Sequence, residues 1–425
     1  MYQLSKDRKE QVYYILLLLV AVLIPTAEAF SIKLASFSVI LLSVWWIASG
    51  DITQKFYNLK NNRLLWLFAA LYLVNLVGLL QHYNVPEANK LLLRKLPILL
   101  FPLIIGTSSA ITKKQIHGLL VAFTASLLLI SLYTFREGWH VLLNRTNITM
   151  LVNLVLIHRP YFGLFCAFAV VALFYFIQLR LQPLLVKVAE GILILYFLFF
   201  IYLLYAKMIV VALIALPFII ATVVLAKKTK PYWVIIAILV IVCAASYVAR
   251  TSATLQLVYH KIINAEDFSY QDYDINIVSS INIRYINWGC SYQVLKKDHN
   301  WVTGLGIGNV QEKLNACYKN LNPWIYESEM NAHNEYLEET LRNGVTGLVI
   351  LLLCFLLPTM MSINKGNYLY FSFLVLFSIC CITESMLSRQ SGILFYSFLN
   401  AVLAFSCLSD RENRLRISTE GSFAG

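Results

Sequence analysis

Long apolar runs without interruption are the feature that most restricts how this chain can fold. The run Ile192–Leu204 contains no charged residue, and comparable runs follow one another along the 425 residues. A helix needs about 20 mostly apolar residues to cross the hydrocarbon core of a bilayer. A strand of a membrane barrel alternates apolar and polar residues instead, and these runs do not alternate. The pattern therefore predicts an all-α polytopic membrane protein.

The overall composition agrees with this prediction. Hydrophobic residues make up 59% of the chain and charged residues only 13%, whereas a soluble domain contains about half and about a quarter. The net charge of +12 comes from lysines and arginines that flank the apolar runs. They do not interleave with aromatic residues as in a nucleic-acid site. We therefore expect membrane lipid, and no nucleic acid, as a partner.

The apolar runs predict about 12 transmembrane helices. They cover residues 12–29, 32–49, 64–81, 91–106, 116–135, 161–179, 188–205, 207–226, 232–249, 342–362, 367–383 and 391–408. The basic N-terminus before the first run mimics a signal peptide, and we interpret this run as an uncleaved first span. The chain then divides into helices one to nine (1–249), an extramembrane segment (250–341), helices ten to twelve (342–410) and a tail (411–425).

Basic residues set the expected orientation. The termini and short loops of one side carry 17 lysines and arginines, and the short loops of the other side carry 8. The richer side is normally cytoplasmic, so both termini are expected there and the segment 250–341 outside. This segment is longer than a helix connection needs. We expect a partly helical cap that carries function.

His333 is the first candidate for chemistry. Leu337, Leu341 and Val345 recur at helical spacing and predict a helix that runs into the tenth span. His333 would lie near the N-terminus of this helix, just outside the membrane. Histidine is the side chain that most readily exchanges a proton near neutral pH. The alternative is a surface histidine satisfied by water.

Two basic residues and one turn are candidates for binding phosphate. Arg284 lies on a stretch with the pattern of an amphipathic helix, where it either binds phosphate bidentately or anchors the helix to the membrane. Lys207 stands between two apolar runs, where a charge is functional or snorkels to the interface. The Gly304–Gly308 turn lacks the lysine and serine of a nucleotide loop, so a tight turn is its alternative.

Four polar residues lie on the outer side at the ends of other spans. Arg159 and Tyr161 open the sixth span, and Glu384 and Arg389 lie between the last two. Glu384 and Arg389 are close enough in sequence to pair with each other, which would be a structural role.

Two cysteines lie in the external segment. An oxidising compartment predicts a disulfide between Cys290 and Cys317. No Cys-x-x-Cys pair occurs among the eight cysteines. We therefore expect no metal site and no cofactor.

Taken in order, the external residues form a recognisable pattern. An Arg is followed four residues later by a Trp, then by Gly-x-Gly, by His-Asn-x-Tyr-Leu, and by Gly-x-x-Gly leading into a span. This pattern resembles the O-antigen ligase and O-antigen polymerase superfamily, and is closest to O-antigen ligases. The residues that carry the resemblance are Arg284, Trp288, Gly304, Gly306, Gly308, His333, Asn334, Tyr336, Leu337, Gly344 and Gly347. The run from Glu384 to Gly392 also looks like members from the Bacteroidetes group.

The resemblance implies an activity and its partners. Members of this superfamily are C-type glycosyltransferases that move a glycan from undecaprenyl pyrophosphate to an acceptor, at the outer face of the bacterial inner membrane. The acceptor is lipid A–core for the ligase, a second lipid-linked repeat for the polymerase, and a protein for the O-oligosaccharyltransferase. The segment 250–341 would then be periplasmic and catalytic, and both termini cytoplasmic.

The resemblance also assigns roles to residues. It implies that His333 is catalytic and that Arg284 binds pyrophosphate. The second arginine of the family falls at Lys207, which keeps the charge but loses the planar fork. The residues we consider as support for the site are Asn334, Tyr336, Tyr161, Arg159, Glu384 and Arg389.

From these roles we expect an O-antigen ligase that joins a glycan to lipid A–core. The reaction would be an inverting, metal-independent displacement, with His333 as general base and two cations stabilising the leaving group. The alternatives within the class are a repeat-unit polymerase and a protein O-oligosaccharyltransferase. Outside the class, a polyprenyl-glycan flippase would show polar residues in several spans and repeated halves.

Overall fold

The computed structural model describes residues 5–29, 32–81, 85–143, 158–179, 182–228, 280–297, 300–321 and 328–422. All the regular structure in these ranges is helical. Together with the apolar character of the helices, this confirms the prediction of an all-α polytopic membrane protein.

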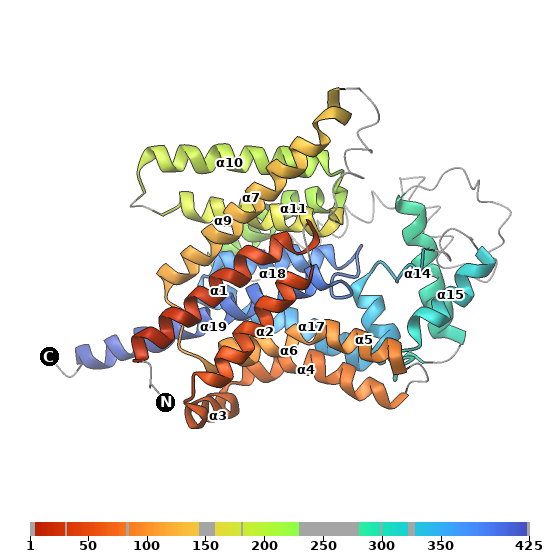
Figure 1. The fold of residues 1–425 in the computed structure, drawn as a ribbon, viewed down its shortest axis with the longest axis horizontal. Helices are drawn as coiled ribbons and strands as arrows, with labels where there is room; N and C mark the ends of the chain where they lie inside the picture. Colours follow the sequence, from red (N-terminus) through yellow and green to blue (C-terminus); the bar gives the residue numbers. More distant parts are fainter. Residues whose placement is uncertain are drawn as a thin grey trace.

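Sixteen helical elements follow one another in the described ranges (Figure 1). The first half contains α1 (Lys6–Ala29), α2 (Ile32–Ala48), α3 (Ile52–Asn61), α4 (Arg63–Val77), η1 (Gly78–Gln81), α5 (Val85–Lys95), α6 (Pro97–Thr107) and α7 (Lys113–Leu143). The second half contains α9 (Arg159–Ile177), α10 (Leu184–Leu203), α11 (Lys207–Lys228), α14 (Ser280–Lys297), α15 (Val310–Leu321), α17 (Glu335–Lys365), α18 (Tyr368–Cys380) and α19 (Gln390–Ser422).

Within the described ranges, eight helices are long and apolar enough to cross a membrane: α1, α4, α7, α9, α10, α11, α17 and α19. Each corresponds to a predicted span. The predicted span 32–49 lies in α2, which forms a pair with α3 bent by 111° that counts as a ninth span if it crosses. The predicted span 367–383 is the shorter apolar helix α18, of 13 residues.

The two remaining predicted spans have different outcomes. Instead of one helix over 91–106, the structure has α5 and α6, which meet at Leu96. Proline lacks a backbone N–H and cannot donate the helical hydrogen bond at its position, so Pro97 accounts for the break although Leu96 itself has helical dihedral angles. The predicted span 232–249 lies outside the described residues.

Two helices occupy the interior of the bundle and two its periphery. Within the apolar stretch of each helix, 89% of the residues of α19 and 67% of those of α9 are buried, against 22% for α10 and 17% for α11. A helix that is apolar on all sides and buried belongs to the core, and an exposed one faces lipid. The rings of Phe165 and Phe395 join the interior pair, with centroids 4.5 Å apart.

A kink near the start of α17 connects the span to the extramembrane segment. Gly344 has φ of +62° inside the helix. The turn at Gly304, with φ of +76°, packs so closely there that a Cβ atom on Gly304 would lie 2.5 Å from the Gly344 nitrogen. Leu305 N donates to Leu341 O at 2.7 Å, using a carbonyl group that the kink leaves unpaired. The glycine-rich turn is therefore a structural joint, which was the alternative to phosphate binding.

The helices α14 and α15 form a small unit at one end of the bundle (Figure 1). A disulfide joins Cys290 of α14 to Cys317 of α15, with Cα atoms 5.8 Å apart. Leu295, Leu314 and Tyr318 are buried between the two helices. Within this unit, α14 also packs against the start of α17.

Candidate active site

His333 lies immediately before α17 in a constrained backbone conformation. Its φ is +47°, a region that residues other than glycine seldom adopt and that is often found at functional sites. His333 N donates to the side chain of Asn331 at 3.0 Å, and Trp288 Nε1 of α14 donates to His333 O at 3.3 Å. Asn334 caps α17, since its side chain accepts from Leu337 N at 3.0 Å. The backbone on both sides of the histidine is thus held in place.

The loop between α18 and α19 packs directly on this helix start. Glu335 N donates to Cys381 O at 2.9 Å, and Asn334 N donates to Ser385 Oγ at 3.2 Å. Tyr161, near the start of α9, donates through its hydroxyl to Ser385 O at 2.9 Å. These contacts place Glu384 next to His333.

His333, Glu384 and Arg284 form an ionic cluster, which we call the His333 cluster. His333 Nδ1 lies 3.2 Å from the Glu384 carboxylate. The Arg284 guanidinium lies 3.8 Å from the same carboxylate, and its Nε donates to Thr383 O at 2.8 Å. The Glu384 side chain is only 3% exposed, whereas His333 is 18% and Arg284 24% exposed. The acid is therefore at the bottom of the cluster and the two basic groups at its opening.

The environment of Glu384 determines which nitrogen of His333 can act. Burial raises the pKa of the Glu384 carboxyl, but the hydrogen bond from His333 and the neighbouring basic groups, Arg284 among them, outweigh it, so the pKa is lowered. An ionised carboxylate only accepts hydrogen bonds. In the neutral form of His333, Nδ1 then carries the proton and Nε2 can accept one. A histidine oriented by a buried carboxylate is the arrangement of a general base.

His158 is a neighbour of this cluster that the sequence interpretation passed over. It occupies the N-cap position of α9 without a capping side-chain hydrogen bond, and its ring centroid lies 5.4 Å from that of Tyr161. Burial, followed by the charge of Arg389, lowers the pKa of His158 to about 4. The side chain is therefore neutral at physiological pH. Its only signal in the sequence was its place in the His-Arg-Pro-Tyr run that opens a span.

The other expected site residues have different surroundings. The structural alternative, a pair between Glu384 and Arg389, is not formed: in the described residues Glu384 pairs with His333 and Arg284, and Arg389 is exposed. Arg159 is half-buried at the start of α9. Tyr336 donates to Ser378 O at 2.9 Å, which ties α17 to α18.

Lys207 is the first residue of α11 and is exposed. A Cβ atom on Gly163 of α9 would lie 3.0 Å from the Ala206 side chain, so the start of α11 packs on α9. Among the residues that the structure describes, Lys207 makes no hydrogen bond or ion pair with the His333 cluster. The structure therefore does not join it to the other two basic residues.

A second ionic cluster, fully enclosed, lies beside the first turns of α17. We call it the Lys95 network. Lys95 of α5 pairs with Glu339, and both side chains are 0% exposed. Arg342 pairs with Glu338 at 2.5 Å and donates to Ser388 Oγ at 3.1 Å. Sequence interpretation missed this network, because Lys95 was counted as a loop residue.

The described residues contain no group of three or more histidine, cysteine, aspartate or glutamate side chains placed to hold a metal ion. Comparison with known families gives a match to part of the chain. The family model for O-antigen ligase matches residues 191–352, which run from α10 to the middle of α17 and include Lys207, Arg284 and His333. Glu384 lies outside the matched range. No curated protein matches the chain significantly.

Proposed function

From the match of residues 191–352 to the O-antigen ligase family model, we propose that the chain is a member of the O-antigen ligase and polymerase superfamily. We propose that it is a membrane glycosyltransferase that transfers a glycan from undecaprenyl pyrophosphate to lipid A–core. The observation that carries the proposal is the His333 cluster. In this cluster the buried carboxylate of Glu384 contacts both His333, which can accept a proton, and the guanidinium of Arg284. Transfer from a pyrophosphate donor needs these two functions.

In the proposed reaction, His333 activates the acceptor. Its Nε2 takes the proton of the acceptor hydroxyl while the hydroxyl oxygen forms a bond to the anomeric carbon. The bond from that carbon to the phosphate oxygen breaks, and its electron pair leaves with undecaprenyl pyrophosphate. Attack opposite the leaving group inverts the anomeric centre. Ionised Glu384 stabilises the imidazolium that forms, as a buried carboxylate does in hydrolytic triads.

Arg284 has the role of stabilising the leaving group. Its guanidinium is partly exposed beside His333, and a charge-assisted contact to phosphate is among the strongest that a side chain makes. Such a contact strengthens as negative charge develops on the leaving oxygen. Lys207 is the second proposed cation, and its contribution would require the bound donor to reach the start of α11.

The proposal includes an orientation in the bacterial inner membrane. The His333 cluster lies where α9, α17 and α19 begin and α18 ends, so it belongs to one end of the bundle. The distribution of basic residues supports a periplasmic position for this end, where the donor presents its glycan. Reporter fusions after Lys230 should be cytoplasmic and fusions at Glu312 periplasmic. The reverse pair of outcomes would overturn the proposal.

The reaction is tested with purified protein, a defined undecaprenyl-pyrophosphate-linked glycan and separate acceptors. Transfer to lipid A–core supports the ligase. Extension of a second lipid-linked glycan would identify a polymerase, and transfer to protein an O-oligosaccharyltransferase. Failure with every acceptor, together with movement of the intact donor across a vesicle membrane, would indicate a flippase.

We also propose that transfer requires no divalent metal, since a guanidinium already faces the leaving group. Activity should persist after treatment with EDTA. Loss of activity that Mg²⁺ or Mn²⁺ restores would contradict this part of the proposal.

A further inference from the structure

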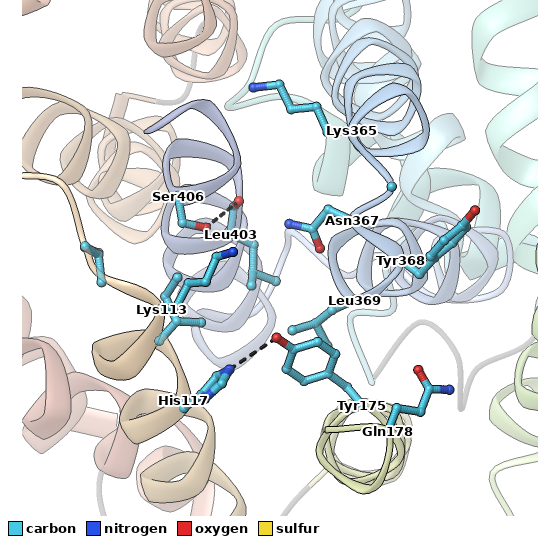
Figure 2. A pocket seen from close by; sticks show the side chains of 13 residues that line it. Lys113, His117, Tyr175, Gln178, Lys365, Asn367, Tyr368, Leu369, Leu403 and Ser406 are labelled. Carbon is cyan, nitrogen blue, oxygen red and sulfur yellow. Dashed lines mark hydrogen bonds between the residues drawn. The ribbon is translucent and has the colours of Figure 1, made fainter. Parts of the chain in front are cut away.

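Figure 2 shows a polar cavity between helices of the bundle. It lies at the C-terminal end of α17, whereas His333 lies just before the N-terminal end of this helix. It has a volume of about 310 Å³. Lys113 at the start of α7, Gln178 just after α9, Lys365 at the end of α17 and Tyr368 at the start of α18 all line it. The 31 residues of α17 separate the cavity from the His333 cluster. At a rise of about 1.5 Å per residue, this is long enough to place the two sites at opposite membrane faces.

The cavity concentrates positive charge next to apolar side chains. Lys113 and Lys365 line it beside the polar ring of His117, and none of the lining residues carries a carboxylate. Figure 2 shows these side chains around a common space, with Leu369 and Leu403 beside them. A cavity of this composition matches a ligand that has an anionic group joined to an apolar body.

Neighbouring contacts hold the basic and polar groups in place. His117 Nε2 lies 3.2 Å from the Tyr175 hydroxyl, and Lys365 Nζ donates to Cys407 O at 2.6 Å. A further cation stands nearby, because the Lys227 ammonium lies 5.9 Å from the centroid of the Tyr368 ring. Lysines of α7 and α17 therefore line the cavity, and a lysine of α11 lies close to it.

Lysines at the cytoplasmic ends of spans are usually explained by the orientation rule alone, and Lys114 is an example. It is exposed in the first turn of α7 and does not line the cavity. Lys113 and Lys365 differ from Lys114, because they come from distant parts of the chain and both line the same cavity. Basic pockets between transmembrane helices on the cytoplasmic side bind the headgroups of anionic lipids.

We propose that this cavity binds the phosphate group of an anionic lipid headgroup, in the leaflet opposite the proposed active site. The basic side chains and the amides of Gln178 and Asn367 would contact the phosphate, and the apolar side chains would contact the start of the acyl chains. The site is independent of the transfer reaction. Its presence does not depend on which acceptor the enzyme uses.

The test uses the full chain, delipidated in detergent, with three probes: dioleoylphosphatidylglycerol, dioleoylphosphatidylcholine and inorganic phosphate. Native mass spectrometry should show retention of one phosphatidylglycerol in preference to phosphatidylcholine, and this lipid should raise the unfolding temperature. The double variant Lys113→Gln/Lys365→Gln should bind phosphatidylglycerol at least about tenfold more weakly, because two charge-assisted contacts are lost. Lys114→Gln is the matched control and should bind as the wild type does.

Equal retention of the two lipids, or equal weakening in Lys114→Gln, would overturn the proposal. If inorganic phosphate protects the wild type as well as phosphatidylglycerol and the double variant loses both effects, the phosphate site stands and its source is soluble. Glycan transfer by the double variant, measured in parallel, shows that the variant is folded, since its substitutions lie far from His333.

Discussion

Two ionic clusters contact the same first turns of α17, and they differ in their exposure. The His333 cluster places a buried carboxylate beneath two partly exposed basic groups. In the Lys95 network, Lys95 and Glu339 are 0% exposed, and Arg342 and Glu338 are 6% and 3% exposed. An ionisable group inside a membrane protein is costly and persists where it is paired or functional. The charged groups of the Lys95 network, which is enclosed, find their partners within the protein. The His333 cluster is open, because its basic groups are partly exposed.

This difference in exposure distinguishes charged groups that stabilise the fold from charged groups that can react with a substrate. The Lys95 network joins α5, α17 and the loop before α19, because Arg342 also contacts Ser388 and Arg94 donates to Ser388 O at 2.9 Å. That loop carries Glu384. The enclosed network therefore fixes the element that orients His333, and we expect its loss to act on folding rather than on the reaction.

The largest effect on activity is expected from His333→Ala. A general base contributes about 10²–10⁴-fold in rate, so transfer should fall by this factor. Donor binding should remain, since the histidine acts on the acceptor. The measurement is in vitro transfer together with separate donor binding. Near-normal turnover would make the motif structural, and lost donor binding would make His333 a phosphate ligand.

Glu335 and Glu339 are acids that closely follow His333 in the sequence and could replace it as base. The structure argues against both, because Leu387 N donates to Glu335 Oε2 at 2.6 Å and Glu339 pairs with Lys95, with both acids fully buried. If His333→Ala retains activity, neither acid is placed to meet an acceptor.

The opposite behaviour is expected when the enclosed network is broken. Lys95→Met removes the closest charged partner of Glu339 and leaves only the more distant Arg342 guanidinium, at 3.8 Å. Breaking a buried pair in this way typically costs about 3–5 kcal/mol. The variant should unfold at lower temperature in detergent, while activity per folded molecule changes little. The double variant Lys95→Met/Glu339→Met is the control and should recover much of the stability, since no charge stays unpaired. Lost activity at unchanged stability would show that the network takes part in transfer.

Much of the fold and the centre of the proposed site could be predicted from the sequence. Apolar runs located most spans because hydropathy is local. His333, Arg284 and the N-cap Asn334 belong to one short region with a recognisable spacing. The break at Pro97 was also readable, but the apolar character of the surrounding run outweighed it.

The partners of these residues were not predictable, because they lie far apart in the chain. Glu384 is 51 residues from His333, and Lys95 is 244 residues from Glu339. Lys95 ends a helix with the pattern of a membrane-surface element, so the positive-inside count treated it as a loop charge. Only the packing of α5 against α17 and the last loop shows which charges are enclosed.

Glu384→Gln should have an intermediate effect and test whether the open cluster works as a unit. The amide can still meet His333 but no longer offers a negative charge to the imidazolium. We expect transfer to fall by roughly 10–10²-fold, less than with His333→Ala, because orientation is partly kept. Glu312→Gln, on the exposed side of α15, is the control and should be active. If Glu384→Gln is as active as the control, the carboxylate does not support the histidine.

The smallest expected effect concerns His158 and appears only in acid. Its pKa is about 4 in the folded protein, against 6.5 for an unperturbed side chain, so the unfolded chain binds more protons between these values. Stability from a neutral His158 is thus complete above pH 6.5 and is lost as the pH falls towards about 4. Glu384 acts in a lower window, because its pKa is lowered from 4.5 and its contribution is lost only below that value. Between pH 6.5 and about 4 the unfolding temperature of the wild type should fall by a few degrees more than that of His158→Gln. Parallel curves for the two proteins would mean that His158 is solvated rather than buried, and would contradict its lowered pKa.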